Sequence, residues 1–432
     1  MRILLISPEQ NYPTQWEMYP SGALLTLGTI WKNAGHEVRI VHIIADKIND
    51  RELRSILYSW KPHLVGITCT TFQLKGTKRI AEIVKTISPK TNVIVGGPHP
   101  SLIGENMLED TPNIDKIVVG EAEQLNLEEI RTPKRTVLHV PPLKDLDTLP
   151  MLDMSLINLS HFKGGVPPGP NPGAFIMASR GCPFDCIFCS KCFNRTVRHK
   201  SVEKVIEEIA WLKKTVGVKE IFFQDDTLNL KPKWTTDLFC NIINKGHNDI
   251  LYRAPFRVNK QLITPDLLRL AKKAGMWLIF YGVENGNQAM LDTMKKGITL
   301  EEIKRAFQLT HKAGIKTEAS FIIGLPGENG LTIIESYELW QALKPFWTGF
   351  SRAIPFPGSE FYEYVKEKGH LLSLPFEDYS PNKVMARTEN LSSSELETYY
   401  EWITKKVWWS KLANLIKNPT IGWKVYRREL YK

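Results

Sequence analysis

The sequence predicts an α/β protein with two successive parallel-sheet domains and a small helical C-terminal segment. Two observations predict this class. Short apolar strands alternate with amphipathic helices over the first ~130 residues, and six further strand–helix units follow from Ala174 onward. Residues 164–173, a stretch rich in Pro and Gly, lie between these two series of units and predict a flexible or turn-rich segment.

The first domain is expected to be a doubly wound, Rossmann-like sheet. Its strands are expected at Arg2–Ser7, Val38–Ile43, His63–Cys69, Asn92–Val95 and Lys116–Val119, the last of the set. Helices are expected between them, at Ser21–Asn33, Arg51–Trp60, Gln73–Ile87 and Leu102–Glu109. Ligands of such a sheet bind beyond the carboxyl ends of its strands. We place the end of this domain near residue 150, after Pro141-Pro142.

The second domain is expected to be a partial (β/α)6 TIM barrel, because six units over ~190 residues are too few for an eightfold one. Strands are expected at Ala174–Ser179, Glu220–Gln224, Leu251–Pro255, Trp277–Val283, Thr317–Ile323 and Gly349–Ile354. Helices are expected at Ser201–Thr215, Trp234–Lys245, Pro265–Ala274, Leu300–Lys312 and Leu331–Leu343, with a further helix at Ser392–Lys405. The expected domains are therefore residues 1–150, 151–375 and 376–432.

Composition narrows the class of protein. The 432 residues are 43% hydrophobic and 24% charged, which is ordinary for a globular chain. No apolar run approaches the ~18–20 residues that span a bilayer, and no signal-peptide core is seen, so we expect a cytoplasmic protein. A net charge of +10 favours anionic partners without identifying one. Six cysteines are too few for a disulfide scaffold.

Four of those cysteines lie close together in the sequence. Cys182, Cys186 and Cys189 follow a predicted strand with C-x3-C-x2-C spacing, and Cys192 comes three residues later. Three thiolates can ligate three irons of a cubane cluster and leave the fourth iron open to a small molecule. Two alternatives stay open: a structural zinc site with Cys192 as fourth ligand, or simply reduced thiols.

These cysteines, with Phe188 before the third, resemble the signature of radical S-adenosylmethionine (SAM) enzymes. The similarity continues in order along the barrel, through the segments 224–226, 281–286, 321–328 and 354–359. The resemblance implies a 4Fe–4S cluster that binds SAM at its open iron. It also implies that an electron from the reduced cluster cleaves SAM to a 5′-deoxyadenosyl radical, in a site that excludes water.

The resemblance also implies roles for side chains at the strand ends. Asp225 or Asp226 would accept from the methionine ammonium, and Glu284 would accept from the ribose hydroxyls. Arg257 or Arg352 would pair with the SAM carboxylate. The backbone around Ile322–Gly324 would frame the adenine. The complete expected SAM-binding set is Phe188, Asp225, Asp226, Arg257, Glu284, Ile323, Gly324 and Arg352. Each residue also has a plainer alternative. The two aspartates could cap a helix, Glu284 could be a solvated charge at a strand end, and the arginines could form structural ion pairs. Gly324 and Gly327 could be ordinary turn glycines.

The first domain resembles the cobalamin-binding domain that precedes many radical SAM barrels, through the segments 20–24, 63–68, 95–100 and 118–121. Small residues at its strand ends would let the corrin and its nucleotide tail approach the backbone. The expected contacts are Thr68, Thr70, Thr71, Gly96, Gly97, Pro98, His99 and Glu121. The D-x-H-x-x-G segment of cobalamin mutases is absent, so no lower axial ligand of cobalt is named. A domain that has lost cobalamin remains an alternative.

The last residues form a basic and aromatic segment, Lys405–Lys432, with eight Lys and Arg residues and one Glu. It fits a helical lid on the barrel, a peripheral membrane or lipid contact, or, third, a nucleic-acid contact. No RNA-binding module accompanies it, which weakens the third interpretation.

Together these features predict a cobalamin-dependent radical SAM enzyme that methylates an unactivated carbon of a small-molecule or lipid substrate. Its electrons would come from an external donor of the flavodoxin or ferredoxin type. A radical cyclase or rearranging enzyme of the same architecture, such as the anaerobic cyclase of chlorophyll synthesis, is the alternative among enzymes. A cobalamin or SAM sensor with a structural cluster is the alternative from another class.

Overall fold

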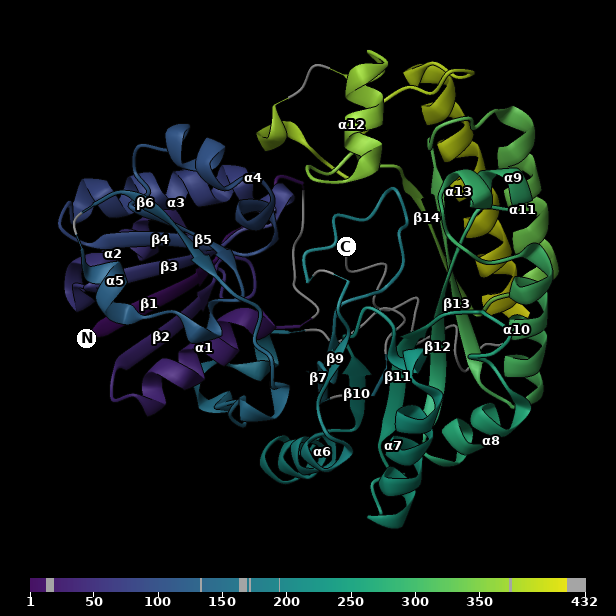
Figure 1. Ribbon diagram of the computed structural model, residues 1–432, viewed down its shortest axis with the longest axis horizontal. Helices are drawn as coiled ribbons and strands as arrows, with labels where there is room; N and C mark the ends of the chain where they lie inside the picture. Colours follow the sequence, from purple (N-terminus) through teal and green to yellow (C-terminus); the bar gives the residue numbers. More distant parts are fainter. Residues whose placement is uncertain are drawn as a thin grey trace. The chain divides into compact units, whose positions relative to one another are not determined.

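The computed structural model describes residues 1–12, 19–132, 134–162, 169–170, 172–193, 195–372 and 375–417 (Figure 1). The chain divides into two compact units. The first is Met1–Lys163 with two short later segments, Ser190–Asn194 and Ser373–Ser380. The second is Gly164–Cys189, Arg195–Leu372 and Pro381–Lys432, so most of the C-terminal region groups with the barrel instead of forming a third unit.

The first unit contains a sheet of six parallel strands. They are β1 (Arg2–Ser7), β2 (Glu37–His42), β3 (Leu64–Thr68), β4 (Asn92–Gly96), β5 (Lys116–Gly120) and β6 (Thr136–Val140), in the order β2-β1-β3-β4-β5-β6. The doubly wound sheet is confirmed. However, β5 is not the last strand, because β6 pairs with it along the edge. The side chains of β6 are at most half-buried, so its sequence lacks the apolar pattern of the inner strands.

Helices cover both faces of this sheet, because the side chains of β1 are buried on both sides. Leu4 and Ile6 point to a core shared with α2 (Asp50–Trp60), α3 (Leu74–Ile87) and α4 (Pro98–Glu109). Ile3 and Leu5 point to the opposite core, against α1 (Gly22–Asn33) and α5 (Leu127–Arg131). A strand that is buried on both sides is typical of parallel sheets.

The second unit contains a separate sheet of six parallel strands, the predicted partial barrel. They are β7 (Gly173–Ile176), β10 (Glu220–Phe223), β11 (Leu251–Phe256), β12 (Met276–Glu284), β13 (Lys316–Ile323) and β14 (Trp347–Arg352), in the order β14-β13-β12-β11-β10-β7. The first predicted strand is too long, because β7 ends at Ile176. Ser179–Arg180 forms a separate strand, β8, paired antiparallel with β9 (Arg198–His199). This small hairpin brackets the cysteine segment.

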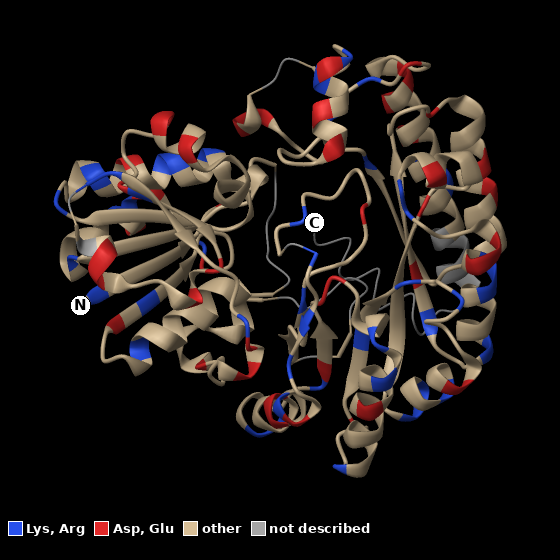
Figure 2. Ribbon diagram, in the orientation of Figure 1, with Lys and Arg blue, Asp and Glu red and all other residues tan. Residues whose placement is uncertain are grey.

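Helices lie along the outside of the barrel sheet (Figure 1). The predicted ones are α6 (Val202–Val216), α7 (Pro232–Asn244), α8 (Pro265–Lys273), α10 (Leu300–Lys312) and α11 (Gly330–Leu343), and two short ones were not predicted, α9 (Gln288–Thr293) and α12 (Glu360–Glu367). The C-terminal helix α13 (Ser393–Lys417) is longer than expected and contacts β14 and α11. Basic and acidic side chains are interspersed along these helices (Figure 2).

Trp423, Tyr426 and Tyr431 of the basic C-terminal segment lie outside the described residues. Within the described part, no helix has the length and apolar character needed to cross a membrane.

Candidate active site

The three cysteines lie on one loop that follows β8. Cys186 is buried, and the amide of Cys189 donates to its carbonyl at 3.1 Å, which closes a turn. The neighbouring Ile187 ties the loop to the barrel: its amide donates to Met294 O at 3.1 Å and its carbonyl accepts from Phe361 N at 2.9 Å. The backbone of the loop is therefore held at its centre.

The donor set of this loop fits an iron–sulfur cluster. All six cysteines of the chain are free of disulfides. Burial raises the pKa of the Cys182 thiol, so its thiolate needs a cationic partner to form. In the described residues no three His, Cys, Asp or Glu side chains converge into a ready-made metal site. The fit thus rests on three thiols within an eight-residue loop and on the charges around them.

The two aspartates after β10 hold the segment that leads into this loop. Asp225 accepts from Ser179 Oγ at 2.5 Å and from Ala178 N at 3.2 Å. Asp226 accepts from Gly181 N at 3.1 Å, one residue before Cys182. Burial raises the pKa of Asp225 to about 7 and also raises that of Asp226. Neither aspartate caps α7, whose N-cap is Lys231. A contact of either with the methionine ammonium remains a prediction.

Arg257 is a buried cation beside the cysteines. Its guanidinium lies over the ring of Phe184, with the carbon 3.4 Å from the ring centroid, and hydrogen-bonds Cys186. Its Nε donates to Asn259 Oδ1 at 2.9 Å. Burial lowers the pKa of Arg257, and the nearby cysteines counter that effect. An arginine held beside the open corner of a cluster can pair with a carboxylate there.

Glu284 ends β12 in a conformation that ordinary side chains rarely adopt. Its φ is +66°, and the pairing with β13 shifts register just before it. Such strained positions persist where the surroundings require them, as at ligand sites. Lys296 Nζ donates to Glu284 Oε1 at 2.6 Å, and Ser320 Oγ donates to Oε2 at 3.3 Å. These two contacts hold the buried carboxylate in one orientation, which suits hydrogen bonds to hydroxyls.

The end of β13 carries the predicted adenine frame, Ile323 and Gly324. Gly324 has a φ of +101°, and its amide donates to the buried carboxyl of Glu328. Asn285 Nδ2 donates to the other oxygen of Glu328 at 2.8 Å. Burial raises the pKa of Glu328 to about 7. One side chain therefore couples the loop after β12 to the loop after β13.

Arg352, at the end of β14, has other partners. It forms a two-point ion pair with Glu397 of α13, with Nε 2.8 Å from Oε2. Its guanidinium also lies over the ring of Tyr400 and donates to Pro381 O at 3.1 Å. The plain alternative of a structural ion pair fits Arg352 well. Of the two candidate arginines, Arg257 is the better placed for a ligand at the cysteines.

In the first unit, the predicted cobalamin contacts Gly96, Gly97 and Pro98 follow β4 and begin α4. Gly97 has a φ of +112°, and a Cβ there would lie 3.0 Å from Cys69 O. Thr68 ends the neighbouring β3. This edge is the carboxyl end of the strands, next to the switch point between β1 and β3, where doubly wound sheets bind ligands.

His99 stands fully buried at the same edge. Its Nδ1 lies 3.1 Å from Thr71 Oγ1, whereas its Nε2 is buried and has no hydrogen-bond partner in the described part of the chain. Burial lowers the pKa of His99 to about 4, so the ring is neutral. Phe376 packs edge-on against it at 5.3 Å. An orphaned buried nitrogen at this edge fits a domain that holds a large ligand.

The remaining predicted contacts occupy nearby positions. The backbone amide of Thr70 already donates a hydrogen bond to Gln73 Oε1 at 3.1 Å. Glu121, just after β5, accepts from Leu143 N at 3.3 Å.

Cys192 is exposed and belongs to the segment Ser190–Asn194 that groups with the first unit, whereas the three motif cysteines group with the second.

Two family models match the chain in the order that the motifs indicate. Residues 17–128 match the B12 binding domain, and residues 176–339 match the Radical SAM superfamily. An uncharacterised methyltransferase of Pyrococcus horikoshii is 29% identical over 92% of this chain and 90% of its own length. The anaerobic magnesium-protoporphyrin IX monomethyl ester cyclase of Rubrivivax gelatinosus is 28% identical over 92% of this chain and 75% of its own.

The fold is shared with a solved structure. The radical SAM methyltransferase TsrM from Kitasatospora setae, with cobalamin and a [4Fe-4S] cluster bound, superposes with a TM-score of 0.67. The alignment covers 92% of this chain and 84% of that one, at 17% identity. This likeness concerns the architecture of both domains.

A cobalamin-binding sheet followed by a radical SAM barrel defines a class of enzymes. This chain belongs to it: it is a cobalamin-dependent radical SAM enzyme, and its cofactors are a 4Fe–4S cluster, SAM and cobalamin. The sensor hypothesis is therefore abandoned, because the matching relatives are enzymes.

Sequence reasoning missed several residues that shape the site. They are Phe184, which lies far along the chain from Arg257, and Lys296 and Glu328, which look like ordinary loop residues in the sequence. Lys296 follows Lys295 directly, and two consecutive lysines give no sign in the sequence that the second is buried. Glu328 could have been found from its place directly after the Gly-Leu-Pro-Gly turn.

Proposed function

We propose that this enzyme methylates an unactivated carbon of a small-molecule or lipid substrate. The observation that carries the proposal is that Arg257 lies buried beside the cysteine loop and Glu284 lies buried at the end of β12, in a chain that also carries the cobalamin domain. A methyltransferase is among its full-length relatives.

When bound, the cofactors supply a radical that removes hydrogen from the substrate and a methyl group that replaces it. The chain supplies the setting. Arg257 would neutralise the SAM carboxylate, and Glu284, held in place by Lys296, would accept from the ribose hydroxyls. Asp226 holds Gly181 and so fixes the entry to the cysteine loop. Arg257, Glu284 and Lys296 are buried, which keeps water from the reacting atoms.

Partners follow from this chemistry. An external one-electron donor of the flavodoxin or ferredoxin type would reduce the cluster, and a reducing compartment, which we take to be the cytoplasm, would preserve it. A lipid substrate or a peripheral membrane contact is supported by Trp408 and Trp409, which are 50% and 63% exposed beside Lys405 and Lys406. We assign no nucleic-acid partner.

The test is anaerobic turnover with SAM that carries a deuterated methyl group. The enzyme is reconstituted with iron, sulfide and cobalamin, reduced, and incubated with a metabolite and lipid extract of cells that lack it. Methylation predicts a product that carries the label, and S-adenosylhomocysteine and 5′-deoxyadenosine in equal amounts. 5′-deoxyadenosine alone, with an unlabelled and altered product, would refute methylation.

A radical cyclase is the second candidate, and the match to the Rubrivivax gelatinosus cyclase favours it. The two candidates share every cofactor. Because only methyl transfer yields S-adenosylhomocysteine, the same experiment separates them. Magnesium-protoporphyrin IX monomethyl ester is the substrate to try first for this alternative.

A further inference from the structure

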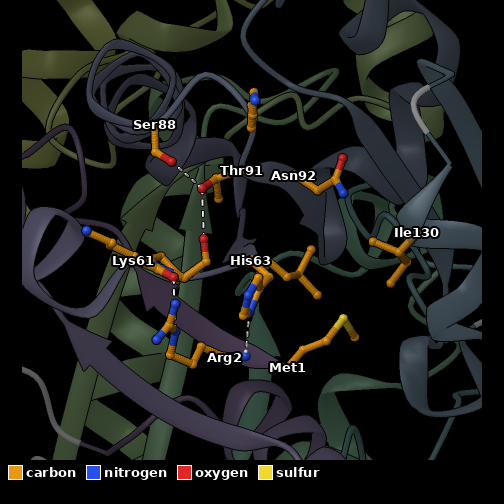
Figure 3. Close-up of a pocket in the computed structure, with 11 residues that line it drawn as sticks. Met1, Arg2, Lys61, His63, Ser88, Thr91, Asn92 and Ile130 are labelled. Carbon is orange, nitrogen blue, oxygen red and sulfur yellow. Dashed lines mark hydrogen bonds between the residues drawn. The ribbon is translucent and has the colours of Figure 1, made fainter.

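The first unit has a concave surface at the amino ends of its strands. A hollow of about 490 Å³ opens between the starts of β1, β3 and β4 (Figure 3). Its lining residues, the amino-edge pocket from here on, are Met1, Arg2, Lys61, Pro62, His63, Leu64, Ser88, Lys90, Thr91, Asn92 and Ile130. The predicted cobalamin contacts lie at the opposite, carboxyl ends of these strands, so the two places are distinct.

The pocket is basic and lined by no carboxylate. Within the part of the chain that the structure describes, Arg2, Lys61 and Lys90 have no ion-pair partner. Arg2 Nε donates only to a carbonyl, Lys61 O, at 3.1 Å.

Several other cations of the same unit form ion pairs with carboxylates. Lys32 meets Asp153 at 2.6 Å, Lys85 meets Asp115 at 2.6 Å, and Lys78 and Arg79 meet carboxylates as well. Three unpaired cations around one hollow repel one another, and an anion in the hollow would relieve that repulsion.

His63 adds an uncharged hydrogen-bond donor to the amino-edge pocket. His63 Nδ1 accepts from Arg2 N at 2.9 Å, so in the neutral ring the proton sits on Nε2, which is left to donate. Figure 3 places this ring at the centre of the pocket, between Met1 and Thr91. Thr91 Oγ1 lies 2.8 Å from both Pro62 O and Ser88 Oγ, which fixes the wall beside it.

We propose that the amino-edge pocket binds the phosphate groups of a phosphorylated small molecule of nucleotide size. Lys61, Lys90 and the outer nitrogens of Arg2 would contact the phosphate oxygens, with His63 Nε2 as a neutral donor. Pro62, Leu64 and Ile130 supply an apolar side for the rest of the ligand. The volume exceeds that of a single phosphate and falls in the range of small-molecule pockets.

The test is equilibrium binding of ADP to the cofactor-loaded enzyme, measured by titration calorimetry with no reductant. Saturating SAM is present, because ADP could otherwise enter the SAM site through its adenosine part. Pyrophosphate and adenosine are the companion probes. We expect saturable binding of ADP and pyrophosphate, none of adenosine, and slower amide exchange over residues 61–64 and 88–92 when ADP is bound.

The decisive variant is the double substitution Lys61→Gln with Lys90→Gln, which should weaken ADP binding by about tenfold. The matched control is Lys304→Gln with Lys312→Gln, two exposed lysines of α10 that change the net charge equally. Iron and cobalamin contents should be the same in all three proteins. The proposal is overturned if the wild type shows no saturable binding of ADP or pyrophosphate, or if both double variants lose affinity alike.

Discussion

Lys296→Met should lower the stability of the folded enzyme far more than Lys295→Met does. Lys296 and Glu284 form a buried ion pair, with side chains 11% and 8% exposed and Nζ 2.6 Å from Oε1. Lys296→Met leaves the carboxylate of Glu284 buried without its cation. Breaking a buried pair on one side costs about 3–5 kcal/mol.

Lys295→Met is the matched control. Lys295 pairs with Glu360 at the same 2.6 Å, but the two side chains are 52% and 53% exposed. An exposed pair of this kind contributes at most about 1 kcal/mol. Each variant therefore removes one positive charge from an ion pair of the same length. The two pairs differ in how deeply their side chains are buried.

Thermal unfolding of the anaerobic holoenzyme measures the difference. For a unit of this size, 3 kcal/mol corresponds to a fall in transition temperature of roughly 6 °C or more. Equal transition temperatures for the two variants would refute the argument that burial of this pair matters.

Three further outcomes are expected. Cys186→Ala should abolish the visible absorbance of the cluster and the release of 5′-deoxyadenosine, whereas Cys192→Ala should retain both; equal loss would contradict the three-ligand assignment. Gly97→Val should lower the cobalamin content of the protein, measured by its spectrum, because the added atoms meet Cys69 O at a φ of +112°. Glu328 binds its proton more tightly folded than unfolded, with a pKa raised from 4.5 to about 7, so its contribution to stability is present at acid pH and lost as the pH rises through 7. Glu328→Gln should therefore lose less stability than the wild type between about pH 5 and 8; an unchanged slope would argue that Glu328 is ionised throughout.

Strands were readable from the sequence where they are buried on both faces or alternate regularly between buried and half-buried side chains. β1 and β13 have the apolar character or strict alternation that predicts a strand, and both begin and end within one residue of expectation. β6 was missed because an edge strand with half-buried side chains carries little of that pattern. α9 and α12 were missed because they are too short for helical periodicity to show.

The sequence by itself determined the class of this protein, because the spacing of Cys182, Cys186 and Cys189 and the order of the strand-end segments are local properties of the chain. Only the tertiary structure decided which charges meet. It placed Lys296 on Glu284, Glu397 on Arg352 and Arg257 over Phe184. These partners come from different elements, and the energy of a charge depends on its burial and on what faces it, which only the packed fold determines.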